Sequence, residues 1–281
     1  MGTTLYKNAD WIITMNEKRE KIRHGDLLIS GKEILDVGTD LEKKYEGTLK
    51  IDHVVEAEGT VILPGFVNVH HHTWQSLIRN IQATRGLKLE PWLTVMYEIY
   101  KDLNTDVARA GVYSGLGDML KTGCTTSNDL WYPHPVGVKY LVDAEIEAAA
   151  EIGIRFHPTR GFHSVPSSIV PPEVVDTKES VVEDTIRLVK KYHDRSRFSM
   201  CQVGIAPSIA QYETEDIIEA VVDLAEEYDI MVHGHLAESQ HEVEYTLKTW
   251  GCRPFEWFKR HRLLGKRFYF AHCIHLNEEE I

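Results

Sequence analysis

Residues 61–72 read VILPGFVNVHHH, and this stretch decides how the rest of the chain is interpreted. Apolar residues run up to three histidines, and a proline and a glycine interrupt the run, a pattern typical of a short strand that ends in imidazoles. Residues two apart on a strand point the same way, so we expect His70 and His72 to share one face and His71 to point to the other. Two neutral imidazoles at a strand end could form half of a site for zinc or a similar divalent metal, and hydrogen-bonded or exposed histidines without a metal are the alternative.

The composition excludes several classes of protein. The chain has 281 residues, 43% of them hydrophobic, and a formal net charge of -12. Its Lys and Arg residues are scattered among acidic residues, whereas nucleic acids and anionic membranes require clustered basic residues. No apolar run has the length of a membrane span, and the four cysteines are widely separated, as expected for free thiols in a reducing cytoplasm. We therefore expect a cytoplasmic globular protein with no nucleic-acid or membrane partner.

Two regions with different patterns follow one another along the chain. Residues 1–63 contain short strands at 11–15, 26–30 and 33–37, and they form a small β unit with little core of its own. From residue 64 onward, short apolar strands alternate with helical stretches. The predicted strands start at Phe66 and then cover 124–131, 153–159, 200–206, 230–236 and 267–272, and the helices cover 105–120, 142–151, 180–193, 214–227 and 254–260.

This alternation favours a parallel (β/α)8 TIM-like barrel over a doubly wound sheet. Only about six of the eight units have a counterpart in this chain, and residues 277–281 resemble the first turn of a helix. We therefore expect that the chain is a fragment, or that something outside it completes the barrel.

Further histidines lie at the ends of two later strands. Residues 233–238 read HGHLAE, and residues 271–275 read AHCIH. Active sites of barrels gather at the carboxyl ends of the strands, so three strand ends with histidine predict one shared metal site. Glu238 is the best candidate for a carboxylate that takes a proton from a metal-bound water, although an acidic residue at a helix start is the alternative. His272 could orient that water or bind substrate.

These motifs resemble the amidohydrolase superfamily, in particular its branch of nucleobase and triazine aminohydrolases, and within it the 8-oxoguanine deaminases. The resemblance covers nearly the whole chain and includes residues 64–79, 91–93, 123–126, 159–161, 235–238, 251–254, 271–275 and 277–281. It implies metal ligation by His70, His72 and His235, with Glu238 as proton shuttle and His272 as a catalytic histidine. It also implies an aspartate ligand at the end of strand eight, for which this sequence has no position.

The resemblance also implies the domain organisation. Residues 1–63 would be a β-sandwich segment that carboxyl-terminal strands complete, and residues 64–281 would be an incomplete metal-dependent barrel. Relatives with two metal ions carry a carboxylated lysine after strand four, where this chain has none, so a single ion fits better. We expect Zn2+, with Fe2+ possible, one per site.

Three residues are candidates for contact with substrate. Gln75 has donors and an acceptor that could read the lactam edge of a heterocycle, and Trp131 could stack on a ring. Arg160 could bind a substrate carbonyl or form a structural ion pair. Core packing is the alternative for the first two residues.

The expected activity is hydrolytic deamination of an amino-substituted N-heterocycle by metal-bound hydroxide, with release of ammonia. The alternatives are a triazine chlorohydrolase or aminohydrolase, an adenosine-type nucleoside deaminase, and a catalytically incomplete fragment. The only partners that we expect are a small-molecule substrate and further copies of the chain in a homo-oligomer.

Overall fold

The computed structural model describes residues 2–281, which divide into two compact units. The first unit ends at Phe66 and the second begins at Val67, close to the boundary expected after Leu63. No helix in the described part of the chain is long and apolar enough to cross a membrane.

The first unit is a single five-stranded sheet. The order is β3 (Glu33–Gly38), β2 (Lys21–Ser30), β1 (Thr3–Ile13) and β4 (His53–Glu56), and β5 (Val61–Ile62) also pairs with β1. A tight turn joins β2 to β3, and Gly31 has a φ of 57° there, a conformation that glycine adopts without strain. Leu5, Leu28 and Leu41 form a small core beside the short helix α1 (Leu41–Lys44). Because these strands belong to one sheet, the sandwich stays a prediction.

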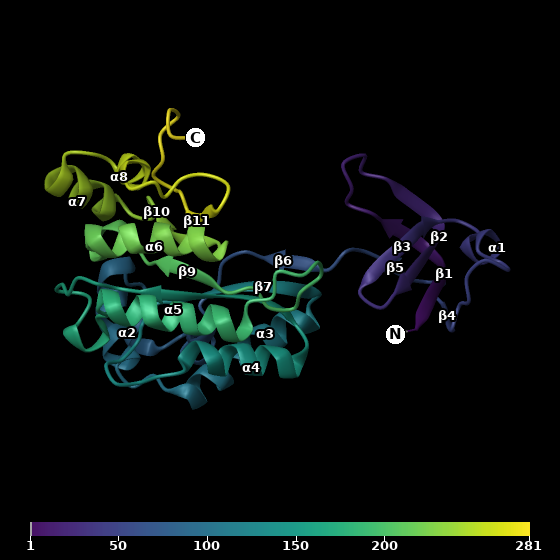
Figure 1. The fold of residues 1–281 in the computed structure, drawn as a ribbon, viewed down its shortest axis with the longest axis horizontal. Helices are drawn as coiled ribbons and strands as arrows, with labels where there is room; N and C mark the ends of the chain where they lie inside the picture. The colour runs from purple at the N-terminus through teal and green to yellow at the C-terminus, as the bar shows by residue number, and fades with distance from the viewer. Residues whose placement is uncertain (1) are drawn as a thin grey trace. The chain divides into compact units, whose positions relative to one another are not determined.

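The second unit is an α/β fold around a six-stranded sheet (Figure 1). Its strands lie in chain order, and the pairs from β7 to β11 are parallel. The strands are β6 (Phe66–Asn68), β7 (Cys124–Trp131), β8 (Arg155–Phe162), β9 (Gly204–Pro207), β10 (Val232–Leu236) and β11 (Phe268–His272). This order and direction agree with part of a TIM-like barrel, in which every carboxyl end meets the same face.

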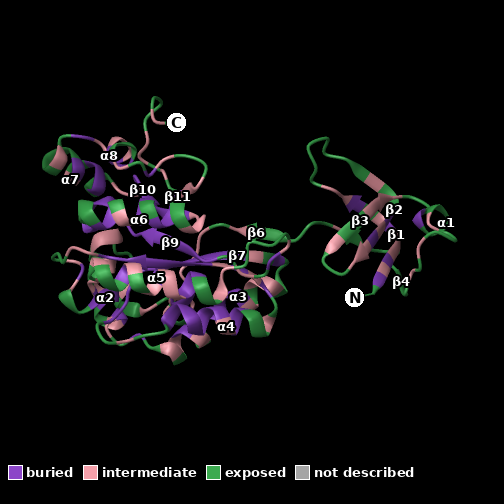
Figure 2. Cartoon of the chain, in the orientation of Figure 1, coloured by how far each residue is buried: buried purple, intermediate pink, exposed green. Residues whose placement is uncertain are grey.

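Helices between the strands cover one side of this sheet. α3 (Thr105–Lys121) contacts β7, α4 (Leu141–Ile152) contacts β8, α5 (Lys178–Tyr192) contacts β8 and β9, and α6 (Glu215–Tyr228) contacts β9. α7 (Gln240–Trp250) and α8 (Pro254–Arg260) join β10 to β11. Buried residues line the strands and the inner faces of these helices, and exposed residues the outer faces (Figure 2).

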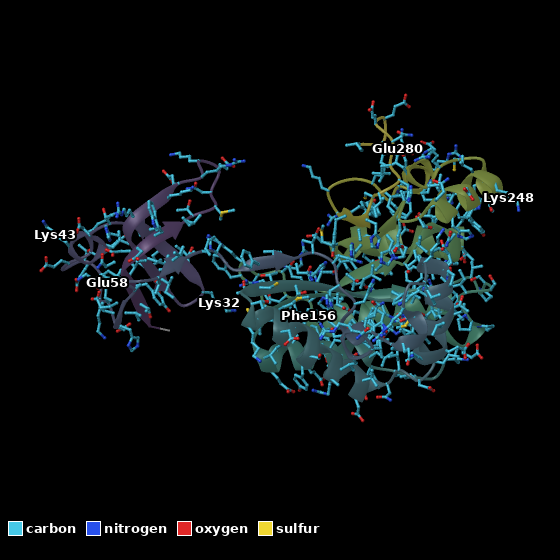
Figure 3. All side chains as sticks on the ribbon, turned by 180° about the vertical axis from the view of Figure 1, so that it is seen from behind. Lys32, Lys43, Glu58, Phe156, Lys248 and Glu280 are labelled. Carbon is cyan, nitrogen blue, oxygen red and sulfur yellow. The ribbon has the colours of Figure 1, made fainter. Side chains whose placement is uncertain are left out.

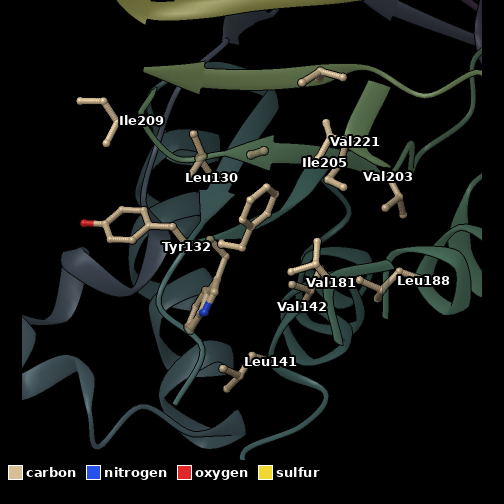
Figure 4. Close-up of a cluster of buried hydrophobic side chains, with 14 of the residues drawn as sticks. Leu130, Tyr132, Leu141, Val142, Val181, Leu188, Val203, Ile205, Ile209 and Val221 are labelled. Carbon is tan, nitrogen blue, oxygen red and sulfur yellow. The ribbon is translucent and has the colours of Figure 1, made fainter. Parts of the chain in front are cut away.

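The main core fills the space between the sheet and its helices. Figure 4 shows Ile205 from β9 beside Val221 from α6, and Val142 from α4 beside Val181 from α5. Phe156 is 2% exposed and lies inside this unit, whereas the side chains of Lys248 and Glu280 extend at its margin (Figure 3). The four cysteines are unpaired, as expected.

Helices α2 (Leu89–Tyr100) and α7 were not expected, and both border the site described below. Thr214 precedes α6, and its hydroxyl donates to Asp216. The last residues have the hydrogen bonds of a helix start, as expected: the N–H groups of Glu279 and Glu280 donate to the side chain of Asn277, and the Glu280 carboxylate accepts from the N–H of Asn277.

Candidate metal centre

Three histidines from two strand ends meet at the carboxyl face of the sheet. The ligand atoms of His70, His72 and His235 all lie within 4.8 Å of one another. His235 belongs to β10, but β6 ends at Asn68, so the first two histidines follow the strand instead of lying on it. The expectation that strand alternation orients them is therefore corrected.

Pairing with β7 orients the histidine triplet instead. The N–H of Leu130 donates to the carbonyl of His71 at 2.8 Å, and the N–H of Thr73 donates to the carboxyl of Asp129. Both partners belong to β7. His71 lines a different cavity from His70, so the two side chains do diverge as expected.

Hydrogen bonds fix the proton of each candidate ligand. Nδ1 of His72 donates to the carbonyl of Leu130 at 2.7 Å, and Nδ1 of His235 donates to the carbonyl of Ser208 at 2.7 Å. A carbonyl only accepts, so each of these Nδ1 atoms carries the proton and each Nε2 keeps its lone pair. This is the state in which a histidine binds a metal ion.

His70 reaches the same state through a fourth histidine. Nδ1 of His233 is 3.0 Å from the carbonyl of Tyr269, so it carries the proton and Nε2 of His233 accepts. That Nε2 lies 2.8 Å from Nδ1 of His70, which therefore donates and leaves its own Nε2 free. The chain Tyr269–His233–His70 thus sets the tautomer of the third ligand.

Burial keeps these imidazoles neutral. It lowers the pKa of His70 to about 3, with help from His233, and it lowers the pKa of His72 and His235 well below the usual range. Nε2 of His72 and Nε2 of His235 face each other at 3.3 Å, with both protons on the opposite ring nitrogens. Two lone pairs that close repel unless a cation lies between the rings, so the donor set fits a divalent metal.

Glu238 and His272 lie beside this triad. Nε2 of His272 is 3.3 Å from Oε1 of Glu238, and the His272 ring is 5.3 Å from that of His70 between centroids. Burial, and secondarily the negative charge of Glu90, raises the pKa of Glu238 to about 7. Burial lowers the pKa of His272. A carboxyl with a pKa near 7 is suited both to accept and to donate a proton at neutral pH.

The turn into α7 positions Glu238. Ala237 adopts a φ of 50°, and Ser239 caps the helix by accepting from the N–H of Glu242. The Glu242 carboxylate in turn accepts from the N–H of Glu238 at 2.8 Å. This reciprocal capping leaves the Glu238 side chain free to face the cavity.

The triad opens into a cavity of about 360 Å³. Its wall contains the aromatic side chains of Trp92, Tyr97, Tyr132 and Tyr212. Of the described residues that line it, none is Lys or Arg, while Glu90 and Glu238 are acidic. The cavity therefore suits a planar molecule without negative charge.

The structure brings only one of the three predicted substrate contacts to this cavity. Gln75 lines it, but its amide nitrogen donates to the hydroxyl of Tyr100 at 3.0 Å. Trp131 is fully buried, and its indole N–H donates to the carbonyl of Pro133 in the core. Arg160 is 2% exposed and pairs with Asp176 and Asp184 at 2.9 Å each, so it has the structural role considered for it above. Trp131 and Arg160 are thus corrected as substrate contacts.

Several lining residues were missed from the sequence. His163 follows β8 and lies 2.5 Å from the hydroxyl of Tyr97 in α2, and Gln211 lies in the short helix η4 (Ala210–Tyr212) after β9. The position of both residues just after a predicted strand was a usable signal, because polar residues after parallel strands meet at one face. Tyr97 gave no such signal, since α2 lacks a polar cap and its apolar pattern has no clear start.

Residues 61–281 match the amidohydrolase family, and the chain belongs to it. Its fold and its histidine cluster agree with those of a family that typically binds a divalent metal.

Individual proteins of known activity are also similar to the chain. It is 32% identical over 229 residues to an 8-oxoguanine deaminase of Pseudomonas aeruginosa, covering 80% of this chain and 51% of that protein. It is 30% identical over 278 residues to a 5-methylthioadenosine/S-adenosylhomocysteine deaminase of Bacillus cereus, covering 99% of this chain and 60% of that protein. The zinc complex of atrazine chlorohydrolase TrzN from Arthrobacter aurescens TC1 superposes with a TM-score of 0.88 and 25% identity, covering 99% of this chain and 62% of that one. The chain thus spans about half to three fifths of these proteins.

Proposed function

We propose that the protein hydrolyses the exocyclic C–N bond of an amino-substituted N-heterocycle and releases ammonia. The observation that carries this proposal is the histidine triad with three free Nε2 lone pairs beside a carboxyl whose pKa is about 7. The chain's similarity to deaminases supports the same reaction.

His70, His72 and His235 would hold one divalent metal ion, and we propose Zn2+, with Fe2+ as the alternative. When bound, such an ion supplies Lewis acidity that lowers the pKa of a coordinated water. Neutral imidazole ligands suit this role because they leave the charge of the ion largely intact.

Glu238 would move the protons of the reaction. As a carboxylate it accepts one proton from the attacking water and passes it to a ring nitrogen. It then takes the second proton from the hydroxyl now on the ring carbon and delivers it to the departing amine, which leaves as ammonia. The water oxygen ends on the ring carbon, so the product carries an oxo group where the substrate carried an amine. His272, 3.3 Å from Glu238, would donate a hydrogen bond to the developing oxyanion.

We propose an oxopurine such as 8-oxoguanine as the preferred substrate. The support is the aromatic wall, which fits a planar ring, and the 32% identity to the deaminase that carries this name. A second candidate is a triazine, which the likeness to atrazine chlorohydrolase supports, and a third is an adenosine-type nucleoside. Ammonia and chloride release from a panel of all three classes distinguishes them, and activity on triazines alone would replace our preference.

The roles assigned to Glu238 and the triad predict opposite effects on activity and metal content. In the full-length protein, Glu238→Gln should lower kcat by at least about 100-fold, because the general base is lost. Zinc content measured by atomic emission should stay at one ion per chain, because Glu238 is not a ligand.

The matched control is Glu244→Gln, an exposed carboxyl on the same helix α7 whose partner is Gln240. It should leave ammonia release unchanged. Near-normal turnover by the Glu238→Gln variant would disprove the proton-shuttle role.

A further inference from the structure

Arg253, which precedes α8, clamps the segment that follows β11. Its Nε donates to Oε1 of Glu280 at 2.8 Å, and one of its Nη atoms donates to Oε2 of the same carboxylate at 3.0 Å. The same Nη atom also donates to the carbonyl of His275. The Glu280 side chain is only 9% exposed, so this carboxylate is shielded from water. A bidentate pair with a shielded carboxylate fixes the geometry of its partners more strictly than an exposed ion pair does.

The clamped segment is also joined to the loop between β10 and α7, which carries the proposed proton shuttle. The N–H of His275 donates to the carbonyl of Ala237 at 2.9 Å, and the N–H of Cys273 donates to the carbonyl of Leu236 at 2.8 Å. The backbone of His275 is thus held by this loop through its N–H and by Arg253 through its carbonyl.

Between β11 and the clamped segment the backbone adopts an uncommon conformation. His272 and Cys273 have φ values of 72° and 57°, in the left-handed region that strains residues with a side chain. Such a conformation persists only where surrounding contacts hold it. Here it accompanies an imidazole whose Nε2 is 3.3 Å from Oε1 of Glu238 and whose ring stacks on that of His235, at 5.1 Å between centroids. The position of His272 therefore depends on contacts that prevent this backbone from relaxing.

We infer that Arg253 is a positioning residue that holds His272 in place beside Glu238. The inference rests on the proposed function, in which His272 donates a hydrogen bond to the developing oxyanion. Arg253 is not among the described residues that line the cavity, so it acts through residues 273–280 and not by contact with substrate. Its loss should slow the chemical step more than it weakens substrate binding, because a small displacement of a catalytic group costs rate.

The first experiment measures kcat and KM of the full-length, metal-loaded protein with the panel compound that releases ammonia fastest. Arg253→Met should lower kcat by about 10- to 100-fold and change KM by less than about 3-fold. The matched control is Arg260→Met at the other end of α8, which removes an exposed ion pair with Glu256 and should leave both constants unchanged. A kcat in the Arg253→Met variant equal to that of the control would overturn the inference.

A double-variant cycle tests whether Arg253 acts through His272 rather than through general stability. His272→Asn removes the imidazole, so adding Arg253→Met to that variant should lower the rate by less than about a further 3-fold. Single-turnover measurements over hours, with the protein in excess, keep slow variants measurable. If the two losses multiply, Arg253 supports the fold or another group, and the inference is overturned.

Amide hydrogen exchange gives a readout that does not depend on turnover. The N–H groups of Cys273 and His275 are hydrogen-bonded and should exchange slowly in the wild-type protein. In the Arg253→Met variant, exchange in residues 273–276 should be at least about tenfold faster, because the clamp is lost. The Arg260→Met control should exchange as the wild type does. Unchanged exchange in the Arg253→Met variant would show that Arg253 does not hold the segment.

Failure of the proposed function would give a different pattern. If the wild-type protein deaminates no compound of the panel, the proposed function fails, and the exchange experiment still tests the clamp. If the wild-type protein and the Arg253→Met variant are equally active, the proposed function stands and the inference about Arg253 fails.

Discussion

Thr73 follows the candidate metal ligand His72, and two buried carboxyls accept hydrogen bonds from its N–H and its hydroxyl. Its N–H donates to Asp129, and its hydroxyl donates to Glu145. Burial raises the pKa of Asp129 to about 7 and that of Glu145 well above its usual range, so the two carboxyls hold at least one proton at neutral pH. The pair of carboxyls therefore carries at most one negative charge. The turn that presents His72 is held by hydrogen bonds to this pair, and two buried charges are avoided.

Removing the Thr73 hydroxyl should destabilise this turn. Thr73→Val keeps the shape but leaves Glu145 without its donor, so we expect the free energy of unfolding to fall by about 1–3 kcal/mol. Chemical denaturation measures this change. Thr122→Val, at the exposed end of α3, should change stability by less than about 0.5 kcal/mol, and equal effects of the two substitutions would contradict the role of the buried pair.

The pH dependence of activity follows from Glu238. Its pKa of about 7 predicts that kcat/KM falls as the pH drops through 7, because the active carboxylate becomes protonated. Glu90 contributes to this high value by charge repulsion, so Glu90→Gln should lower the pKa and move the acidic limb of the pH profile to lower pH. A limb that stays in place or moves upward in the Glu90→Gln variant would contradict this assignment.

At the scale of elements, α3 packs closely against the turn that follows the histidine triplet, and Gly111 of α3 has no room for a side chain at this contact. A Cβ at Gly111 would lie 2.9 Å from Cα of Trp74 and 3.0 Å from the carbonyl oxygen of Thr73. Both contacts are to backbone, which cannot move aside as a side chain can. The same helix carries Gly117, where a Cβ would meet nothing within 4 Å.

These two glycines form a matched pair for experiment. Gly111→Ala should push α3 away from the turn, lower the free energy of unfolding by about 1–3 kcal/mol and weaken zinc binding. Gly117→Ala should raise stability by about 0.4–1 kcal/mol, because alanine favours the helix. Thermal melts with and without zinc test both expectations, and equal behaviour of the two variants would show that the close contact has no effect.

At the scale of the whole molecule, metal binding should couple the strands that carry the ligands. β6 and β10 lie apart in the sheet order, and the triad joins residues that follow or belong to them. Removal of metal from the full-length protein should lower its Tm, and added zinc should restore the Tm. By mass action, zinc at 100 times its Kd raises the free energy of unfolding by about 2.7 kcal/mol. The double variant His72→Leu, His235→Leu should show no zinc-dependent Tm, and a wild-type-like rise in it would place the ion elsewhere.

The sequence predicted the second unit closely where local signals were strong. The bounds of β7 and α8 agree with the predicted residues, and α3 begins at the predicted Thr105, with Asn104 as its cap. These segments have Gly, Pro or cap residues at their ends, which act locally. The α/β class and the barrel-like strand order followed from the alternation of such segments.

Features that depend on distant contacts could not be predicted. The histidine triplet is oriented by pairing with Leu130 and Asp129, some sixty positions away, and not by a strand of its own. Trp131 was expected at the cavity. Alternation along β7 predicts that its side chain lies on one face of the sheet, but not which face is covered; α3 and α4 cover that face, so Trp131 is buried in the core. The partner of Arg160, Asp176, lies in an irregular segment whose path no periodic pattern indicates.

The absence of Lys and Arg from the described cavity lining has a consequence for phosphorylated substrates. A nucleotide with the same base would find no Lys or Arg in this part of the wall to pair with its phosphate. If the proposed function holds, we therefore expect a free base to be deaminated faster than its 5′-phosphorylated nucleotide, which ammonia release from the two compounds would measure.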